Sequence, residues 1–507
     1  MKKKIIYDED GDTFFFGAMQ GKVVDGMKEW YDYLCSRNID IIDYSCISCD
    51  VTTLIDVPSA ERLGDRWKSY EQSYQWQLMS NAKEMYASGT DGLHLACEAA
   101  HRNGKTIIGQ MRMNDAHHVN NMTRDVSEYL CPQYIIDHPE LRIVNELDNK
   151  KIYLPDYSFE KVRELKLNVL SEIAHNYDVD GIELNWMRWC QFFPLSKQRK
   201  NAYILTQFVR DVRKMLDEEG KRKGRRLTLH HKVASTLDES LGIGLDVSAW
   251  IKEGLADSLQ PMDFLFTDYN IRVEEFADLC KGTCCEAYPV IHDSLGGTKD
   301  ISGRNAAPFD ENRCRAAVSN IYSWGGDGIV MFNYTNFGNG FFDKTRFEKY
   351  ISLMSESEGF SDPRQYLYIP TWKWRGGSSP TGLLNAQTIQ FRSDEMGKRE
   401  AFKFRMADGR MGEKLEGRFS IYINEVSNPD IFRFDINGTV ISPEKIILKY
   451  VSPVGDDGLL SNGIRYEVSL ADCPPFKGDN ELGMTWIEKN WLVANDPYME
   501  ILRIDVF

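Results

Sequence analysis

Residues 178–189 read Asp-Val-Asp-Gly-Ile-Glu-Leu-Asn-Trp-Met-Arg-Trp, an apolar strand that ends in polar and aromatic side chains. Successive side chains of a strand point to opposite sides, so Glu183 and Asn185 share one face while Ile182 and Leu184 share the other. If the Ile182 and Leu184 face packs on helices, Glu183 and Asn185 point into an enclosed space. Such a strand is typical of an active-site barrel.

Apolar strands alternate with amphipathic helical segments from about residue 13 to 357, which is the pattern of βα units around a parallel sheet. The predicted strands are Thr13–Met19, Ile39–Ser45, Thr106–Met113, Gly181–Trp186, Arg226–Val233, Ser258–Asp263, Cys285–Ile291 and Gly328–Tyr334. Predicted helices include Phe159–Asn176, Lys197–Glu219, Asn312–Trp324 and Phe347–Met354. Eight such units predict an α/β fold, a (β/α)8 TIM barrel that forms a catalytic domain over residues 1–360.

The sequence changes character after residue 361, where short strands with alternating apolar residues follow one another. They are predicted at Ala401–Met406, Arg418–Asn424, Phe432–Asn437, Ile446–Tyr450, Arg465–Leu470 and Met499–Val506. Asn437-Gly438 between two of them indicates a type I′ hairpin. Residues 361–507 are therefore predicted to form an accessory antiparallel β-sandwich, for which packing on the barrel is favoured over sugar binding.

Composition narrows the classes of partner. Acidic residues (76) outnumber basic ones (61), and the net charge of −15 repels a phosphate backbone, so no nucleic acid partner is expected. No run is apolar enough to span a membrane, and acidic residues interrupt the N-terminus before a signal sequence can form. The sequence as written predicts a cytoplasmic protein, or a periplasmic or secreted one if a signal peptide was removed. Its 11 irregularly spaced cysteines predict buried free thiols, with no metal and no cofactor.

Functional side chains of a barrel lie at the C-terminal ends of its strands and in the loops that follow. In strand order the candidates are Asp43 and Asp50; Arg112, Asn114 and Asp115; Glu183, Asn185, Trp186 and Arg188; His230 and His231; Gln260 and Asp263; His292 and Asp293; and Asn333 and Asn336. Glycoside hydrolysis needs two carboxylates, with amides and aromatic rings to hold the sugar. The candidates match that need. The irregular segment from Asn120 to Leu154 is expected to form a lid or a wall of the site.

Four segments together resemble the glycosyl-hydrolase-like barrels of carbohydrate-degrading bacteria: Met111–His118, Asp178–Arg188, Leu241–Val247 with Trp250, and Gly326–Tyr334. The resemblance spans roughly residues 13 to 357. It implies a glycosidase that acts on an oligosaccharide or polysaccharide. Members of that group usually have Asp where this chain has Asn185, so Glu183 would have to act in its place.

Glu183 and Asp263 are the predicted catalytic pair, with Asp115 and Asp293 in reserve. Melibiase-type α-galactosidases pair a group on the fourth strand with an acid after the sixth, where Asp263 stands. A second arrangement takes the nucleophile from the seventh strand, but Glu286 lies at the start of that strand, at the wrong end of the barrel. The predicted substrate-binding residues are Arg112, Asn114, Asp115, His118, Asn185, Trp186, Arg188, His231, His292 and Asn333.

Two other functions stay open. A metal-dependent hydrolase is suggested by the histidines, but adjacent His117 and His118 would point apart in a loop, and the predicted first strand contains no His-x-His pair. A carbohydrate-binding barrel without activity is permitted by Asn185.

Overall fold

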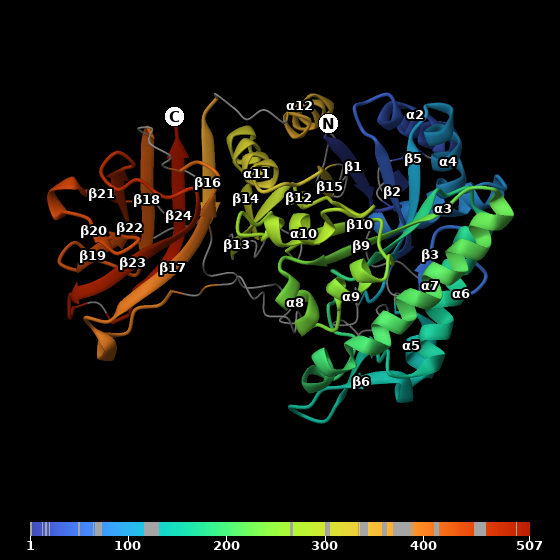
Figure 1. The fold of residues 1–507 in the computed structure, drawn as a ribbon, viewed down its shortest axis with the longest axis horizontal. Helices are drawn as coiled ribbons and strands as arrows, with labels where there is room; N and C mark the ends of the chain where they lie inside the picture. The colour runs from blue at the N-terminus through green and yellow to red at the C-terminus, as the bar shows by residue number, and fades with distance from the viewer. Residues whose placement is uncertain are drawn as a thin grey trace.

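The structure is a computed structural model. It describes residues 3–12, 14–15, 18–19, 21–48, 51–63, 65, 73–115, 131–263, 267–299, 305–332, 334, 343–356, 362–368, 387, 389–409, 415–450, 463–492 and 494–507. Figure 1 shows an α/β barrel, coloured blue to yellow, beside an antiparallel β-sandwich coloured orange to red.

Eight parallel strand positions form the barrel in the described part of the chain. They are β1 (Lys4–Glu9), β2 (Ile41–Ser48), β5 (Thr106–Arg112), β8 (Gly181–Asn185), β9 (Thr228–Ala234), β10 (Ser258–Met262), a seventh strand split into β11 (Glu286–Ala287) and β12 (Val290–His292), and β15 (Gly328–Phe332). The strand order is β11-β10-β9-β8-β5-β2-β1-β15-β12. Because β11 pairs with β10 and β12 pairs with β15, the seventh strand joins both ends of the sheet and closes the (β/α)8 TIM barrel.

Helices surround the strands, and several begin at a side chain that accepts a hydrogen bond from the backbone N–H three residues later. Asp91, Thr236, Asp246, Asp310 and Asp343 cap α4, α8, α9, α11 and α12 in this way. The helices are α2 (Val23–Cys35), α3 (Ser73–Ala87), α4 (Gly92–Arg102), α5 (Gln133–Asp137), α6 (Glu160–Asn176), α7 (Ala202–Lys223), α8 (Leu237–Gly242), α9 (Val247–Lys252), α10 (Val273–Cys280), α11 (Glu311–Ser323) and α12 (Lys344–Met354).

Short extra strands extend the barrel loops. They are β3 (Thr52–Thr53) and β4 (Glu61–Arg62), the hairpin β6 (Arg142–Val144) with β7 (Lys151–Pro155), and the hairpin β13 (Ser294–Lys299) with β14 (Asn305–Pro308). The segment 120–154 was expected to lack regular structure. From residue 131 onward that expectation is wrong, because the segment contains α5 and the β6–β7 hairpin; the part before residue 131 lies outside the described residues.

The C-terminal part contains two antiparallel sheets. One has the order β16 (Arg364–Tyr368), β24 (Tyr498–Val506), β18 (Gly417–Asn424), β22 (Gly463–Ser469) and β21 (Ile447–Tyr450); the other has the order β17 (Arg399–Met406), β23 (Gly478–Glu488), β19 (Ile431–Ile436) and β20 (Thr439–Val440). Aromatic rings from the two sheets meet between them: Phe404 of β17 lies 6.0 Å from Phe419 of β18, and Phe434 of β19 lies 5.0 Å from Tyr466 of β22, as ring centroids. The sheets therefore form the sandwich that follows the barrel.

The predicted hairpin at Asn437-Gly438 is confirmed. Asn437 has φ 52° and Gly438 has φ 79°, and they join β19 to β20. A type I′ turn requires positive φ at both positions, which Asn and Gly adopt most easily.

The barrel and the sandwich share polar contacts along α11 and at the start of α10. Arg313 Nε donates to Gln365 Oε1 at 2.7 Å, and the backbone N–H of Ala407 donates to Asn320 Oδ1 at 2.7 Å. Arg405 of β17 forms an ion pair with Glu274 at 2.6 Å. The predicted boundary at 360/361 falls among residues outside the described ones, so the division 1–360 and 361–507 stays a prediction.

The first predicted strand is wrong. The barrel begins at Lys4–Glu9, whereas Phe14 and Phe15, two described residues of the predicted segment Thr13–Met19, are helical. Lys4–Glu9 and Thr13–Met19 are both short and apolar. The acidic residues that follow Tyr7 make the first of them less recognisable as a strand. The other predicted barrel strands overlap observed ones. In the sandwich, β16 and β23 were not predicted, since β23 starts in the polar sequence Gly478-Asp-Asn-Glu481.

Four aspartates make the same hydrogen bond at the N-terminal face of the barrel. They stand directly before the second, fourth, sixth and eighth barrel strands, which are β2, β8, β10 and β15. The carboxylate of each accepts the backbone N–H of the second residue of the barrel strand before it: Asp40 from Ile5 at 3.0 Å, Asp180 from Ile107 at 3.0 Å, Asp257 from Leu229 at 2.8 Å and Asp327 from Ala287 at 2.8 Å. All four bonds lie at the face of the barrel that contributes stability, opposite the mouth.

We expect Asp327→Ala to lower the free energy of unfolding by about 1 to 3 kcal/mol, because the N–H of fully buried Ala287 loses its acceptor. The measurement is equilibrium unfolding in denaturant. Asp278→Ala, at an exposed position of α10, is the control and should stay within about 0.5 kcal/mol of the parent. Equal stability of the two variants would contradict the role given to Asp327.

Candidate active site

A buried ion cluster occupies the barrel interior. The ammonium of Lys232, from β9, lies 2.8 Å from Asp8 Oδ2 of β1, 2.8 Å from Asp43 Oδ2 of β2 and 2.5 Å from Glu183 Oε1 of β8. All four side chains are fully buried. One cation therefore links three other strands across the interior of the barrel.

An amide pair extends this cluster toward the mouth. Gln110 of β5 donates from Nε2 to Asp8 Oδ1 at 3.2 Å and to Asp43 Oδ2 at 3.0 Å, and its Oε1 accepts from Asn185 Nδ2 at 3.1 Å. Asn185 Oδ1 in turn accepts the backbone N–H of Met187 at 3.0 Å. Asn185 is thus fixed between the ion cluster and the loop that follows β8.

Three carboxyl groups share a single ammonium, and the pKa values of two of them, Glu183 and Asp8, are raised. Burial, followed by the charge of Asp43, raises the pKa of Glu183 well above its usual value. Burial also raises the pKa of Asp8 to about 6, although Lys232 opposes the change. Burial alone would lower the pKa of Lys232, but Asp43, Asp8 and Glu183 outweigh it and raise that pKa. Burial and neighbouring charges thus favour the protonated forms of Glu183 and Asp8, and the charged form of Lys232, relative to the same groups in water.

The mouth of the barrel, at the C-terminal ends of the strands, holds a second charged group. Arg112 at the end of β5 forms ion pairs with Asp10, which follows β1, and with Asp115 Oδ2 at 3.1 Å. Burial raises the pKa of half-buried Asp12 to about 7, Asp10 raises it further, and Arg112 and Arg188 oppose the rise. Two guanidinium groups and three carboxyl groups therefore meet at this edge.

Arg188 lies deep in the mouth, 5 % exposed, with its guanidinium carbon 5.8 Å from the ring centroid of Phe332. Burial lowers its pKa, and the neighbouring charge of Arg112 lowers it further. Asp263 follows β10 and is half-buried. Burial raises the pKa of the Cys190 thiol, Asp263 raises it further and Arg188 lowers it, which places both charged groups near Cys190.

The other predicted residues divide into mouth, core and undescribed positions. His292, at the end of β12, forms an ion pair through Nδ1 with Asp293 Oδ1 at 2.8 Å. Buried Asn114 donates from Nδ2 to the carbonyl of Gln191 at 2.6 Å, which ties the loop after β5 to the loop after β8. His118 and Asn333 lie outside the described residues, as do Asp50 and Asn336.

Trp186 and His231 face the helices and not the barrel interior. The Trp186 ring packs against Phe192 at 5.2 Å and Trp250 at 5.9 Å, and His231 lies 4.7 Å from Trp250, as ring centroids. Both residues are fully buried, and burial lowers the pKa of His231 to about 3. Neither ring has a face left for a sugar, which corrects their assignment to substrate binding.

Sequence reasoning missed Asp8, Asp10, Asp12 and Lys232. The signal was present, because Ile5-Ile6-Tyr7 followed by an acidic run matches a buried strand that ends in carboxylates. Lys232 shares a strand face with His230, one alternation away. Glu286, by contrast, lies at the N-terminal face as predicted, where it forms an ion pair with Lys4 at 2.7 Å.

Among the described residues, no group of three or more histidine, cysteine, aspartate or glutamate side chains has an arrangement that could hold a metal ion. Within the same part of the chain, no helix is both long and apolar enough to cross a membrane.

No protein-family model matches the sequence, and no curated protein matches it either. Solved structures do match. α-L-Fucosidase isoenzyme 2 from Paenibacillus thiaminolyticus is 10% identical with a TM-score of 0.40, over 70% of this chain and 49% of that one. A noncanonic maltogenic α-amylase from Thermotoga neapolitana is 12% identical with a TM-score of 0.38, over 96% and 99%. A glycoside hydrolase family 18 N-acetylglucosaminidase from Paenibacillus barengoltzii is 12% identical with a TM-score of 0.38, over 70% and 99%. This chain spans about half the length of that fucosidase.

Proposed function

We propose that this protein is a glycoside hydrolase that cleaves a glycosidic bond of an oligosaccharide or polysaccharide at the mouth of its barrel. One observation carries the proposal: Asp12, a carboxyl group whose pKa is raised to about 7, stands at the C-terminal edge of a (β/α)8 barrel beside Arg112 and further carboxylates. Catalysis in such barrels takes place at that edge, and cleavage of an acetal needs an acid that still holds its proton near neutral pH.

In this proposal Asp12 is the general acid. Its proton passes to the glycosidic oxygen while the bond from that oxygen to the anomeric carbon breaks, so the leaving sugar departs as a neutral alcohol. Arg112 and Arg188 hold hydroxyl oxygens of the sugar next to the breaking bond. Arg112 also holds Asp10 and Asp115 in place through its ion pairs.

Asp263 is the second carboxylate of the proposal. It follows β10, is half-buried, and lies near Cys190, as Arg188 does. A separation of about 5 Å between the two carboxyl groups makes it a nucleophile and gives retention, whereas about 6.5 to 9.5 Å makes it a base for water and gives inversion.

Glu183 receives a different role from the one that the sequence suggested. Its carboxyl group is fully buried and bound to Lys232, one layer below Asn185. We assign it to positioning: with Asp8, Asp43 and Lys232 it supports Gln110 and, through Gln110, the amide of Asn185 at the mouth. Asn185 then binds a substrate hydroxyl.

The test is hydrolysis by the purified protein of a panel of oligosaccharides and polysaccharides, with new reducing ends as the readout. We expect turnover of at least one, with a single anomer formed first. The double variant Asp12→Asn/Asp263→Asn, purified in the same way, is the control for contaminating glycosidases. Binding of a glycan without any turnover would contradict the proposal and favour a non-catalytic barrel.

A further inference from the structure

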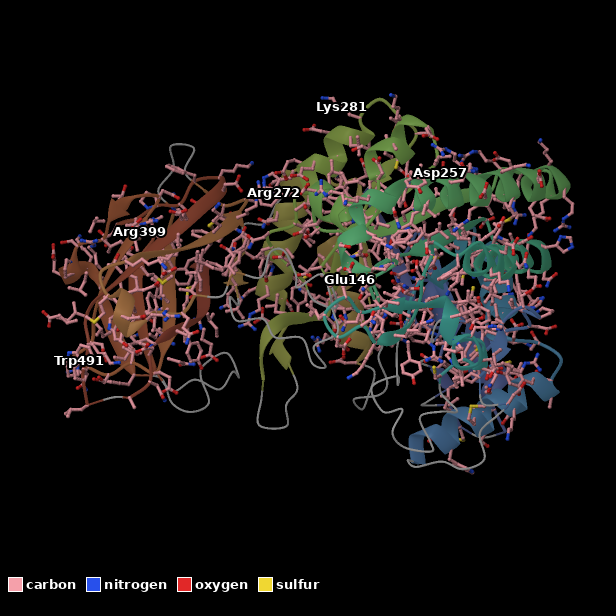
Figure 2. All side chains as sticks on the ribbon, turned by 90° about the horizontal axis from the view of Figure 1, so that it is seen from below. Glu146, Asp257, Arg272, Lys281, Arg399 and Trp491 are labelled. Atoms are coloured by element: carbon pink, nitrogen blue, oxygen red, sulfur yellow. The ribbon has the colours of Figure 1, made fainter. Side chains whose placement is uncertain are left out.

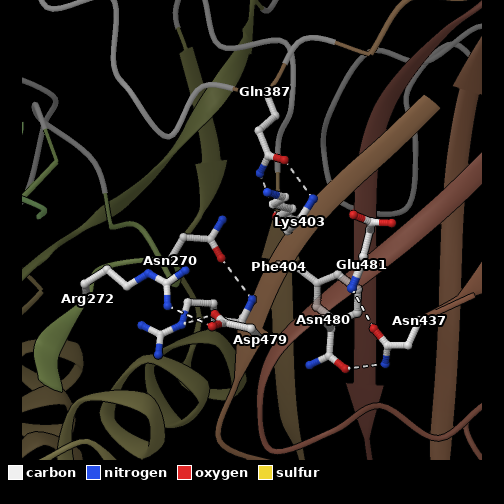
Figure 3. Close-up of a pocket in the computed structure, with 10 residues that line it drawn as sticks. Asn270, Arg272, Gln387, Lys403, Phe404, Asn437, Asp479, Asn480 and Glu481 are labelled. Atoms are coloured by element: carbon white, nitrogen blue, oxygen red, sulfur yellow. Dashed lines mark hydrogen bonds and ion pairs between the residues drawn. The ribbon is translucent and has the colours of Figure 1, made fainter.

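A cleft of ≈ 570 Å³ lies where the barrel meets the sandwich, away from the barrel interior. Its lining includes Asn270 and Arg272, from the loop between β10 and α10, and Lys403, Asn437, Asp479 and Glu481 from the four-stranded sheet and its hairpin. Figure 3 shows the two barrel residues on one side and Glu481 and Asn437 on the other. The volume is in the range of small-molecule binding sites, about 300 to 1,000 Å³.

Hydrogen bonds within the protein fix the asparagine side chains that line the cleft. On the sandwich side, Asn437 donates from Nδ2 to Asn480 Oδ1 at 3.0 Å and accepts the N–H of Glu481 at 2.8 Å. On the barrel side, Asn270 Oδ1 accepts the N–H of Arg405 at 2.9 Å. The polar groups are thus ordered before any ligand arrives, which lowers the entropic cost of binding.

An ion-pair bridge joins the two sides. Arg272 Nη1 lies 2.9 Å from Asp479 Oδ2, and Arg405 Nε lies 2.7 Å from Asp479 Oδ1. Because one carboxylate is bound by an arginine of the barrel loop and by another of β17, the width of the cleft is set by the contact between barrel and sandwich.

The charges around the cleft balance. Arg272, Lys403 and Arg405 contribute three positive charges to its lining, and Asp479 and Glu481 contribute two negative ones. Glu274 of α10 supplies a third negative charge, because it forms an ion pair with Arg405 at 2.6 Å. An anion would meet two carboxylates and a cation three positive groups, so a ligand without charge fits best. Within the described part of the chain, the ammonium of Lys403 and the side-chain NH2 of Asn270 donate no hydrogen bond. Lys403 is the cross-strand neighbour of Glu481, whose Oε1 forms an ion pair with Arg399 at 2.8 Å. Hydroxyl groups satisfy donors and acceptors alike.

We propose that this cleft binds a neutral oligosaccharide at a site separate from the barrel mouth. The choice of a sugar as the polyhydroxylated ligand rests on the proposed function. The loop that carries Asn270 and Arg272 begins after Asp263, so the same loop borders the mouth at one end and the cleft at the other. Glycan held in the cleft is thereby kept close to the proposed site of cleavage.

The test is calorimetric titration of the full chain, in the Asp12→Asn/Asp263→Asn background to prevent turnover. The probes are hexasaccharides of α-1,4-glucose, β-1,4-glucose, β-1,4-xylose and β-1,4-N-acetylglucosamine. We expect saturable binding of at least one. Lys403→Trp, which fills the cleft, should weaken it at least about tenfold, and Lys403→Ala should weaken it about threefold to tenfold. Lys281→Trp, at an exposed barrel position marked in Figure 2, is the matched control and should bind as the parent does.

Three results would overturn the inference: no binding of any of these hexasaccharides, unchanged affinity in Lys403→Trp, or tighter binding of a hexagalacturonate than of every neutral probe. The outcome is distinguishable from failure of the proposed function. A protein that hydrolyses no glycan but loses affinity through Lys403→Trp keeps the cleft site, whereas one that hydrolyses glycan and is insensitive to Lys403→Trp does not.

Discussion

We expect Asp12→Asn to lower kcat by about two to four orders of magnitude on a substrate with a sugar leaving group, because an amide cannot donate the proton that the departing oxygen needs. The loss should shrink to about tenfold or less on an aryl glycoside whose phenolic leaving group is acidic enough to depart without help. Steady-state rates on both substrates give the measurement. Asp278→Asn is the matched control and should behave as the parent protein.

The pH profile gives a second readout of the same group. The pKa of Asp12 is raised to about 7, so the fraction that holds a proton falls as the pH rises through that value. The parent kcat should therefore decline between about pH 6 and 8, and Asp12→Asn should lack this decline. An unchanged profile, or a variant with more than half of the parent activity on the natural type of leaving group, would show that Asp12 is not the acid.

The second large effect concerns Lys232. We expect Lys232→Met to lower the free energy of unfolding by about 3 to 5 kcal/mol at pH 7, because Asp8, Asp43 and Glu183 are left buried without the cation that neutralises them. Equilibrium unfolding in guanidinium chloride measures the loss. Lys281→Met, at an exposed site, should stay within about 0.5 kcal/mol of the parent.

The direction of the pH dependence follows from the carboxyl groups. Asp8 and Glu183 have raised pKa values in the folded protein, so the stability they contribute is fully present below their unfolded pKa values and is lost as the pH rises through the folded ones. Without the lysine this loss becomes larger, so the deficit of Lys232→Met should be smaller at pH 5 than at pH 7. Adding Glu183→Gln should restore part of the stability at pH 7. A deficit that grows toward low pH would contradict the account.

Much of the fold was predictable, because periodicity is a local property. The alternation of strands and helices indicated the barrel, and Asn437-Gly438 fixed a hairpin through its own backbone preferences. The first strand, β1, was not predictable in this way. The polar residues after Tyr7 resemble a surface segment, and only the pairing of β1 with β2 and β15 shows that they belong to the barrel. Trp186 was placed wrongly although the alternation of β8 indicates its direction. It continues the face of Ile182 and Leu184, and that face packs against helices.

The site was predictable only in part. Arg112, Asp115, Asn185 and Arg188 meet at the mouth because each follows or ends a predicted strand. The role of Lys232, however, depends on its ion pairs with residues of β1, β2 and β8. No local sequence pattern indicates such contacts across a barrel. The junction cleft depends on how the barrel loop at Asn270 meets β17, which is a property of the assembled chain.

The four aspartates at the N-terminal face divide the barrel into quarters. Each bond runs within one pair of neighbouring strands: β1 with β2, β5 with β8, β9 with β10, and β11 with β15. A shift of one residue in the pairing of the two strands would break the hydrogen bond to the aspartate. Each bond therefore favours the correct register of its own strand pair. A circular permutation that places the new chain ends between two quarters would leave all four bonds inside unbroken segments. New ends within a quarter would separate an aspartate from the strand whose N–H it accepts. The N-terminal face of the barrel thus consists of four separate units, although its strands form one continuous sheet.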